Sequence, residues 1–287
     1  MIKTEGLTYQ YGHGTPFEKT AVNNISVDIK KGEFVGIIGH TGSGKSTFVQ
    51  HLNGLLKPDS GKVYIDGKDI WEKPKEIRKY RFKAGLVFQY PEYQLFEETC
   101  YKDIAFGPKN MGLDERETDR RVRRAAQIVE LKEELLEKSP FDISGGEKRR
   151  VAIAGVLSMR PEILILDEPT AGLDPKGRDR ILGQILEYRQ ETGATVLLVS
   201  HSMENIARIS DRVLVMNCGS MKMFGTVDEV FSRADELNAI GLELPEITKI
   251  FHRLHERGLG VSPNIYTVED GEKEILRVLK QEDIGRS

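Results

Sequence analysis

The sequence holds only two cysteines and one tryptophan, and no apolar run comes near the roughly 20 residues of a membrane-spanning helix. Cys100 and Cys218 lie far apart and match no metal-ligand spacing, which excludes a zinc site or disulfide framework. Basic charge is not in excess either, since 42 Lys and Arg face 45 Asp and Glu, giving −3. This balance argues against a generally basic nucleic-acid-binding surface. With no signal-peptide pattern at Met1, we expect a cytoplasmic protein with reduced thiols.

The 287 residues include 39% hydrophobic and 30% charged residues, a composition that suits a soluble chain with a real core. Short apolar runs rich in Val, Ile and Leu are typical of parallel strands covered on both faces, and they occur at 34–38, 86–88, 163–166, 195–199 and 213–216. Between two of them, residues 114–138 predict an inserted helix, and we interpret its cluster Arg120, Arg121, Arg123 and Arg124 as a solvated face. The segment 228–287 predicts helices from two apolar sets, Ile247, Ile250, Phe251 and Leu254, then Ile275, Val278 and Leu279.

A glycine-rich segment follows the apolar run at 34–38 and precedes a stretch in which Phe48, Val49 and Leu52 recur at helical spacing. It fits the pattern G-x-x-x-x-G-K-[ST] in the strand-to-helix context of a phosphate loop. In such a loop the backbone N–H groups face phosphate oxygens, the lysine reaches the β and γ phosphates, and the hydroxyl binds Mg²⁺. The segment predicts an ATP site that includes Gly39, His40, Thr41, Gly42, Ser43, Gly44, Lys45, Ser46 and Thr47.

Two carboxylates, Asp167 and Glu168, end the apolar run at 163–166. Asp167 is suited to hold Mg²⁺ through its water shell. Glu168 is suited to orient and deprotonate a water that attacks the γ-phosphate. An acidic turn without a ligand is the alternative interpretation, and the phosphate loop in the same chain makes it the minor one.

A third segment, Ile143-Ser-Gly-Gly-Glu147, precedes cationic residues and an apolar helix. Taken with the two nucleotide motifs, it resembles the L-S-G-G-Q signature of ATP-binding cassette (ABC) ATPases, with Ile143 and Glu147 as mild departures. In that family the signature faces the phosphate loop of the opposite subunit, so that two ATP molecules lie within a head-to-tail dimer. The resemblance implies nucleotide contacts from Ser144, Gly145, Gly146 and Glu147.

The resemblance covers about residues 1–227 and implies an α/β fold. We expect a phosphate-loop (RecA-like) nucleotide-binding core with an N-terminal β subdomain, a helical subdomain inserted at about 93–160, and a small C-terminal helical extension at 228–287.

Further positions match the family in order. Tyr11 matches the residue that stacks on adenine, although nearby Tyr9 leaves an ordinary tyrosine open. Gln89 matches the Q-loop glutamine, Asp174 the D-loop at the dimer interface, and His201 the switch histidine that contacts the γ-phosphate. The resemblance thus implies Glu168, His201, Lys45 and Gln89 as catalytic residues, and Ser46, Gln89 and Asp167 as Mg²⁺ ligands. The other histidines that we considered, His40, His51, His252 and His255, are expected at loop or surface positions.

Several stretches resemble, within that family, the ATPase subunits of energy-coupling factor (ECF) transporters, which import vitamins or transition-metal ions: 14–21, 88–99 and 104–108. Gly14-Thr-Pro and Thr41 favour the second of the two paralogous subunits. The resemblance implies a peripheral protein on the cytoplasmic face of the membrane, which hydrolyses ATP with Mg²⁺. Its implied partners are a paralogous ATPase, a transmembrane coupling subunit and a substrate-binding membrane subunit, with no nucleic acid, and its tail helps to hold the dimer.

Some alternatives stay open. The ATPase of a conventional ABC importer and a soluble, non-transport cassette protein share the same motifs. We expect a heterodimer because the family pairs two such subunits, and a homodimer is the alternative that the motifs leave open. We also expect Glu92, which follows the Q-loop, to pair with an arginine of the transmembrane coupling subunit. The neighbouring Tyr93 fits either that surface or an ordinary turn.

Overall fold

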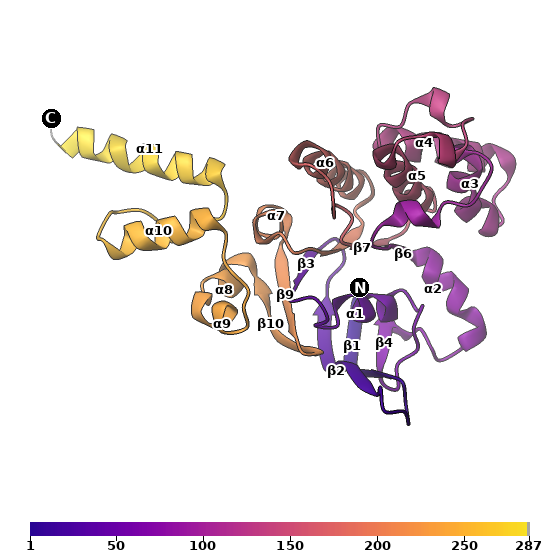
Figure 1. Ribbon diagram of the computed structural model, residues 1–287, viewed down its shortest axis with the longest axis horizontal. Coiled ribbons are helices and arrows are strands. Elements are labelled where there is room, and N and C mark those ends of the chain that lie inside the picture. Colours follow the sequence, from indigo (N-terminus) through magenta and orange to yellow (C-terminus); the bar gives the residue numbers. More distant parts are fainter. Residues whose placement is uncertain (286–287) are drawn as a thin grey trace. The chain divides into compact units, whose positions relative to one another are not determined.

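The computed structural model describes residues 1–285, with side chains described up to Lys280 (Figure 1). The chain divides into two compact units. The first unit joins Met1–Glu33 to Ser46–Val199, and the second joins Phe34–Lys45 to the chain from Ser200 onward. Within the described residues, no helix combines the length and apolar character that a membrane span requires.

An antiparallel sheet with strand order β2-β1-β4-β5 opens the first unit. On its strand β1, Ile2, Thr4 and Leu7 are buried whereas Lys3 and Glu5 are exposed. This alternation places one face of the sheet against the core. The sheet matches the expected N-terminal β subdomain, and its strands are β1 (Ile2–Tyr11), β2 (Lys19–Ile29), β4 (Ser60–Ile65) and β5 (Lys68–Asp69).

Three parallel strands form the centre of the first unit: β6 (Ala84–Val87), β7 (Ile163–Asp167) and β8 (Thr195–Val199). Every residue of the three is buried, as expected for strands covered on both faces. The helix α6 (Pro175–Thr192) crosses from β7 to β8. The carboxyl ends of these strands therefore lie together at one edge, where α/β proteins place their ligands.

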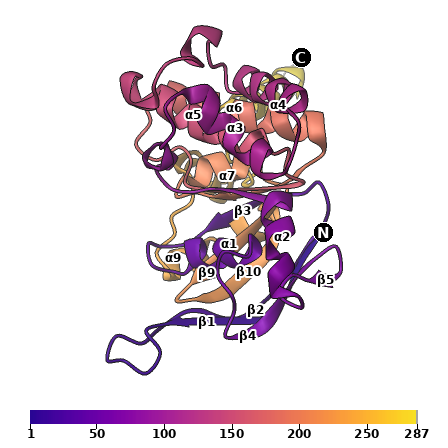
Figure 2. The same cartoon turned by 90° about the vertical axis from the view of Figure 1, so that its right-hand side faces the viewer.

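The helices of the first unit are α1 (Lys45–Leu52), α2 (Ile77–Lys83), α3 (Cys100–Asn110), α4 (Glu115–Ile128) and α5 (Gly145–Leu157) besides α6. Helices α3, α4 and α5 pack on one another (Figure 2). Their buried contacts include Ile104, Val122 and Ile153. These helices fall within the range in which the sequence predicts an inserted helical subdomain.

The inserted helix is shorter than expected, because α4 ends at Ile128 and not near residue 138. Glu130 adopts a left-handed conformation with φ of +50°. Its N–H donates to the Gln127 carbonyl at 3.0 Å, and the Leu131 N–H donates to the Ala126 carbonyl at 2.8 Å. This is a Schellman termination without the usual glycine, and for that reason no residue in the sequence marks the end of the helix.

In the second unit, β3 (Phe34–Ile38) and β9 (Arg212–Asn217) are parallel, and β9 pairs antiparallel with β10 (Ser220–Thr226). The helix α7 (Met203–Ile209) packs on β3. The expected tail helices follow as α8 (Val227–Phe231), α9 (Ala234–Ala239), α10 (Glu246–Glu256) and α11 (Val268–Gly285).

The tail has a small core of its own. Phe251, Val261 and Ile265 are buried, and the side chains packed against them are Ile247, Leu254, Ile275 and Val278. Two members of the predicted apolar sets lie outside this core, since Ile250 and Leu279 are about half exposed. Helical periodicity thus identified the helices, whereas the structure shows which members of each set enter this core.

Candidate nucleotide-binding site

The phosphate loop turns directly after β3, and its glycines take backbone conformations that other residues avoid. Gly42 and Gly44 have φ of +79° and +99°. A Cβ on Gly39 would lie 2.3 Å from the Met216 carbonyl oxygen, so no side chain fits there. The Ser43 hydroxyl is buried and has no hydrogen-bond partner within the described residues. A curled, glycine-rich turn with an unused buried donor suits an anionic oxygen such as that of a phosphate.

Lys45 closes this loop and is 5% exposed. Its Nζ donates to the carbonyl oxygens of Gly39 at 2.8 Å and of His40 at 2.9 Å. The His40 carbonyl also accepts the Ser43 N–H at 3.1 Å. The backbone carbonyls of the loop therefore hold the Lys45 ammonium group at the loop itself. A positive charge at this place suits the binding of a polyphosphate.

Predicted catalytic groups of the first unit meet at the ends of β6 and β7. Asp167, the last residue of β7, is 4% exposed. Glu168 has φ of +51°, a strained conformation for a residue with a side chain, and its N–H donates to the Val199 carbonyl at 3.1 Å. Gln89 donates from Nε2 to Glu168 Oε2 at 3.2 Å. The structure thus brings the expected Q-loop glutamine and the expected general base into direct contact.

The signature segment forms the start of α5. Ser144 caps the helix, because its Oγ accepts the Glu147 N–H while Glu147 Oε2 accepts the Ser144 hydroxyl at 2.7 Å and N–H at 2.8 Å. These bonds from Ser144 hold the pKa of Glu147 below its ordinary value. A Cβ on Gly145 would meet nothing within 4 Å, and one on Gly146 only the tip of Arg150. The structure therefore leaves open space beside both glycines of the signature.

Tyr11 and Tyr9 differ in exposure and in the side chains that pack against their rings. Tyr11 is 42% exposed, and its hydroxyl lies 3.3 Å from Thr47 Oγ1 at the start of α1. The Tyr9 ring packs edge-on against Tyr11, with centroids 4.9 Å apart, and against His51 at 4.8 Å. Of the two tyrosines, Tyr11 is the more exposed, and its hydroxyl contacts the nucleotide motif at Thr47.

The surface position expected for His51 was wrong. His51 is fully buried, and its Nδ1 pairs with the Thr47 carbonyl at 2.7 Å. Burial lowers the pKa of His51, because the charged ring would lose its hydration, and the Thr47 bond offsets this only in part.

This burial predicts a pH dependence of stability. Below a pH near the unfolded value of 6.5, the unfolded chain takes up a proton that the folded chain refuses, so the folded state loses stability as the pH falls. Above that pH His51 makes no such contribution. We expect the fall in Tm between pH 7.5 and 5.5 to be smaller in His51→Gln than in the wild type. His252→Gln, in the tail, is the control, and equal falls in all three proteins would exclude His51 as the cause.

Asp174 and His201 occupy the starts of two helices. Asp174 caps α6, where its Oδ1 accepts the Gly177 N–H at 2.7 Å. His201 is exposed before α7 and lines a cavity of about 310 Å³ together with Gly39, His40 and Thr41. In the second unit the expected switch histidine and the phosphate loop therefore open onto the same space.

The pairing expected for Glu92 was wrong, because the carboxylate is engaged within the chain. Its two oxygens accept from Arg149 Nε at 3.0 Å and from Nη2 at 2.6 Å, and both side chains are largely buried. Arg149 also donates to the Ala171 carbonyl at 2.6 Å. Sequence reasoning missed Arg149, which ties the signature helix to the segments after Gln89 and after Glu168.

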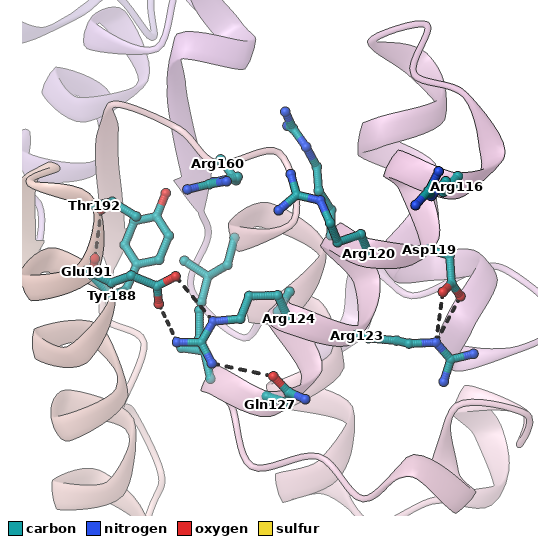
Figure 3. Close-up of a pocket in the computed structure, with 14 residues that line it drawn as sticks. Arg116, Asp119, Arg120, Arg123, Arg124, Gln127, Arg160, Tyr188, Glu191 and Thr192 are labelled. Atoms are coloured by element: carbon teal, nitrogen blue, oxygen red, sulfur yellow. Dashed lines mark hydrogen bonds and ion pairs between the residues drawn. The ribbon is translucent and has the colours of Figure 1, made fainter.

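The arginine cluster of α4 borders a cavity of about 650 Å³ that α6 closes on its other side (Figure 3). Arg120 and Arg121 share Glu117, whose pKa they hold at about 2. Arg124 reaches across the cavity to Glu191 on α6 (Figure 3). These ion pairs support the interpretation of a solvated, charge-balanced face, with Arg121 as its least exposed member.

Comparison with known proteins agrees with this geometry. The family model described as ABC transporter matches residues 22–171, more than half of the chain. A solved cassette described as MJ0796 in a dimer bound to ADP and Pi is 32% identical, with a TM-score of 0.71 over 79% of this chain and 99% of that one. The chain belongs to the ABC transporter family, and the expected α/β cassette fold is confirmed.

A finer comparison places the chain within that family. The energy-coupling factor transporter ATP-binding protein EcfA2 of Clostridium tetani is 55% identical over 278 residues, which is 96% of each chain. The solved cbiO1 of Clostridium perfringens, part of the ABC transporter complex cbiONQ, is 41% identical with a TM-score of 0.73, over 88% of this chain and 98% of that one. This chain is thus an ATP-binding, ATP-hydrolysing component of the energy-coupling factor type, as predicted.

Proposed function

We propose that this chain converts ATP binding and hydrolysis into uptake of vitamins or transition-metal ions through a membrane complex at whose cytoplasmic face it is held. The observation that carries the catalytic part is the hydrogen bond from Gln89 to Glu168. It joins two motifs that lie 79 residues apart in the sequence. It also places the Glu168 carboxylate, the proposed general base, beside the Gln89 side chain, a proposed Mg²⁺ ligand.

Nucleotide binding follows from the phosphate loop and its neighbours. The N–H groups of Gly39–Thr47 face the phosphates, and Lys45 offsets the charge of the β and γ groups. The exposed face of Tyr11 stacks on the adenine. Glu168 accepts a proton from the attacking water, and His201 contacts the γ-phosphate and helps to position that water.

The cation that accompanies ATP is Mg²⁺, for which Ser46, Gln89 and Asp167 are the proposed ligands. All three offer oxygen donors, which Mg²⁺ prefers. The Gln89 amide nitrogen is used by Glu168, which leaves the amide oxygen as the donor toward a cation. When bound, Mg²⁺ neutralises negative charge on the phosphates.

Two copies of the cassette are needed for the complete site in this proposal. Gly145 and Gly146 leave open space above the start of α5, so the ATP of a partner subunit can approach Ser144 and the helix N-terminus closely. Glu147 fixes the Ser144 hydroxyl that makes this contact. Asp174 lies at the same dimer interface. The partner that we favour is a paralogous ATPase, with the tail from 228 onward adding to the contact.

A surface for the transmembrane coupling subunit lies beside the segment that follows Gln89. A cavity of about 280 Å³ is lined by Leu95, Phe96, Phe106 and Met159, among others. Phe96 and Phe106 are 59% and 47% exposed and pack edge to face at 5.0 Å. Exposed aromatic pairs at a groove are typical anchors for an amphipathic helix. The substrate-binding membrane subunit then joins through the coupling subunit.

Purification from membranes tests this proposal. We expect the wild-type chain to recover a second cassette ATPase and a polytopic membrane protein. Phe106→Asp should reduce that recovery at least about tenfold, because an aromatic anchor that the partner would cover becomes charged, while ATP binding is retained. Phe17→Asp is the matched control, since Phe17 is 86% exposed and far from the groove in sequence. Equal recovery with both variants would contradict this surface, and recovery of no membrane protein would contradict the transport complex.

A further inference from the structure

The C-terminal tail contacts the phosphate loop inside the second unit. His40, the second residue of the loop, pairs through Nε2 with the carbonyl oxygen of Ile240, 200 residues further along the chain. Because a carbonyl only accepts, the imidazole is the donor. Gly241, Leu242 and Glu243 of the tail also line the 310 Å³ cavity onto which His201 opens. The tail therefore forms part of the wall around the predicted nucleotide site.

The end of α9 is shaped for this contact. The Leu242 N–H donates to the Leu237 carbonyl at 2.9 Å, and the Gly241 N–H donates to the Asn238 carbonyl at 2.8 Å, which makes a Schellman termination. Ile240, the capping residue, directs its carbonyl to His40, where the negative end of the helix meets a ring N–H. Each part of this turn has a defined hydrogen-bonding role.

Two separate features favour glycine at position 241. Its φ of +70° lies in the left-handed region, which favours glycine. A Cβ at this position would also lie 2.9 Å from His40 Nε2 and 3.0 Å from Cε1, closer than real Cβ atoms pack. Gly258, elsewhere in the tail, has a similar φ of +82°, but a Cβ there would meet nothing within 4 Å. The two glycines share a left-handed backbone, and the approach of His40 distinguishes Gly241 from Gly258.

His40 is also the residue that organises the loop. Its carbonyl accepts both Lys45 Nζ at 2.9 Å and the Ser43 N–H at 3.1 Å. When the His40 side chain is held in place, the carbonyl that accepts from Lys45 Nζ and from the Ser43 N–H is held in place as well. We propose that the Ile240–Gly241 turn is a positioning element of the nucleotide site, which holds the phosphate loop in its binding conformation through His40. This inference rests on the proposed nucleotide-binding role of the loop.

The test compares ATP affinity in full-length variants by titration with a fluorescent ATP analogue. Gly241→Ala should bind ATP roughly 2- to 10-fold more weakly, the effect of one net hydrogen bond, whereas Gly258→Ala should bind as the wild type does. Both variants bear a similar backbone strain, and only Gly241→Ala also disturbs the His40 contact, so its unfolding temperature should fall at least as far as that of Gly258→Ala. An equal ATP affinity of the two variants would overturn the inference.

Two further variants keep the test decisive if Gly241→Ala folds poorly. His40→Ala should show the same loss of affinity, and His40→Gln should restore it, because the glutamine amide can donate to the same carbonyl. A His40→Ala protein with wild-type affinity contradicts the inference. Lys45→Ala tests the proposed nucleotide site separately from the role of the tail. If it binds ATP normally, the proposed nucleotide site itself fails, whereas its loss of binding beside an unaffected His40→Ala removes only the role of the tail.

Discussion

Replacing Glu168 with Gln is expected to lower ATP turnover about 10²- to 10⁴-fold, the range in which a positioned general base contributes. The amide has the size of the carboxylate and is able to keep the Gln89 contact, but it cannot take a proton from water. ATP affinity should stay within a few-fold of the wild type, since Glu168 makes no contact with the phosphate loop in this proposal. The loss belongs to the chemical step, at about 3–5 kcal/mol of activation free energy.

The measurement is single-turnover hydrolysis, with the bound nucleotide identified after rapid quenching. Glu168→Gln protein should retain ATP, whereas the wild type should hold ADP. The control is Glu162→Gln at the opposite end of β7, where an exposed carboxylate pairs with Lys83 at 3.1 Å. Its loss removes a surface ion pair worth at most about 1 kcal/mol and should leave turnover unchanged. Turnover by Glu168→Gln within tenfold of the wild type would show that another group is the base.

The short motifs of the site and its long-range contacts differ in how far the sequence predicts them. Residue types and spacing were sufficient for the phosphate loop, the acidic strand end at Asp167 and the signature, because each is a short segment whose chemistry depends on neighbouring residues. The S-x-x-E pattern of Ser144 and Glu147 also signals the capping box seen in the structure. These local patterns succeeded because their hydrogen bonds join near neighbours, whereas the local turn at Glu130 was missed because it lacks the usual glycine.

Contacts over long sequence distances were not predictable in this way. The bond between His40 and Ile240 depends on the backbone path of 200 residues, and neither residue signals it. The burial of His51 likewise depends on Tyr9 of a strand that precedes the loop. Arg149 offered a partial signal, since it lies four residues before the buried Ile153 and so shares its helix face. Because Arg149 stands in a run of three cationic residues, this spacing alone did not identify it as the buried one.

Arg149 and Glu92 form the ion pair for which we expect the second large effect. Glu92→Gln should lower the free energy of unfolding by about 3–5 kcal/mol, because it leaves the Arg149 guanidinium, 4% exposed, without its counter-charge. Arg149→Met should cost a similar amount. It strands the Glu92 carboxylate and leaves the Ala171 carbonyl without its 2.6 Å donor. The control Arg123→Met removes exposed pairs with Asp119 and Glu133 and should cost no more than about 1 kcal/mol.

Urea unfolding of the two single variants and of the double variant Glu92→Gln/Arg149→Met measures the coupling. The double variant should lose much less than the sum of the single losses, because no buried charge is then left unpaired. Burial alone would raise the pKa of Glu92, but the hydrogen bonds from Arg149 reverse this and hold it below 4.5. The stability from this pair is therefore complete above that pH and is lost as the pH falls through the folded-state pKa. Additive losses, or a single-variant loss as small as that of Arg123→Met, would show that this pair does not join helix α5 to the segments that follow Gln89 and Glu168.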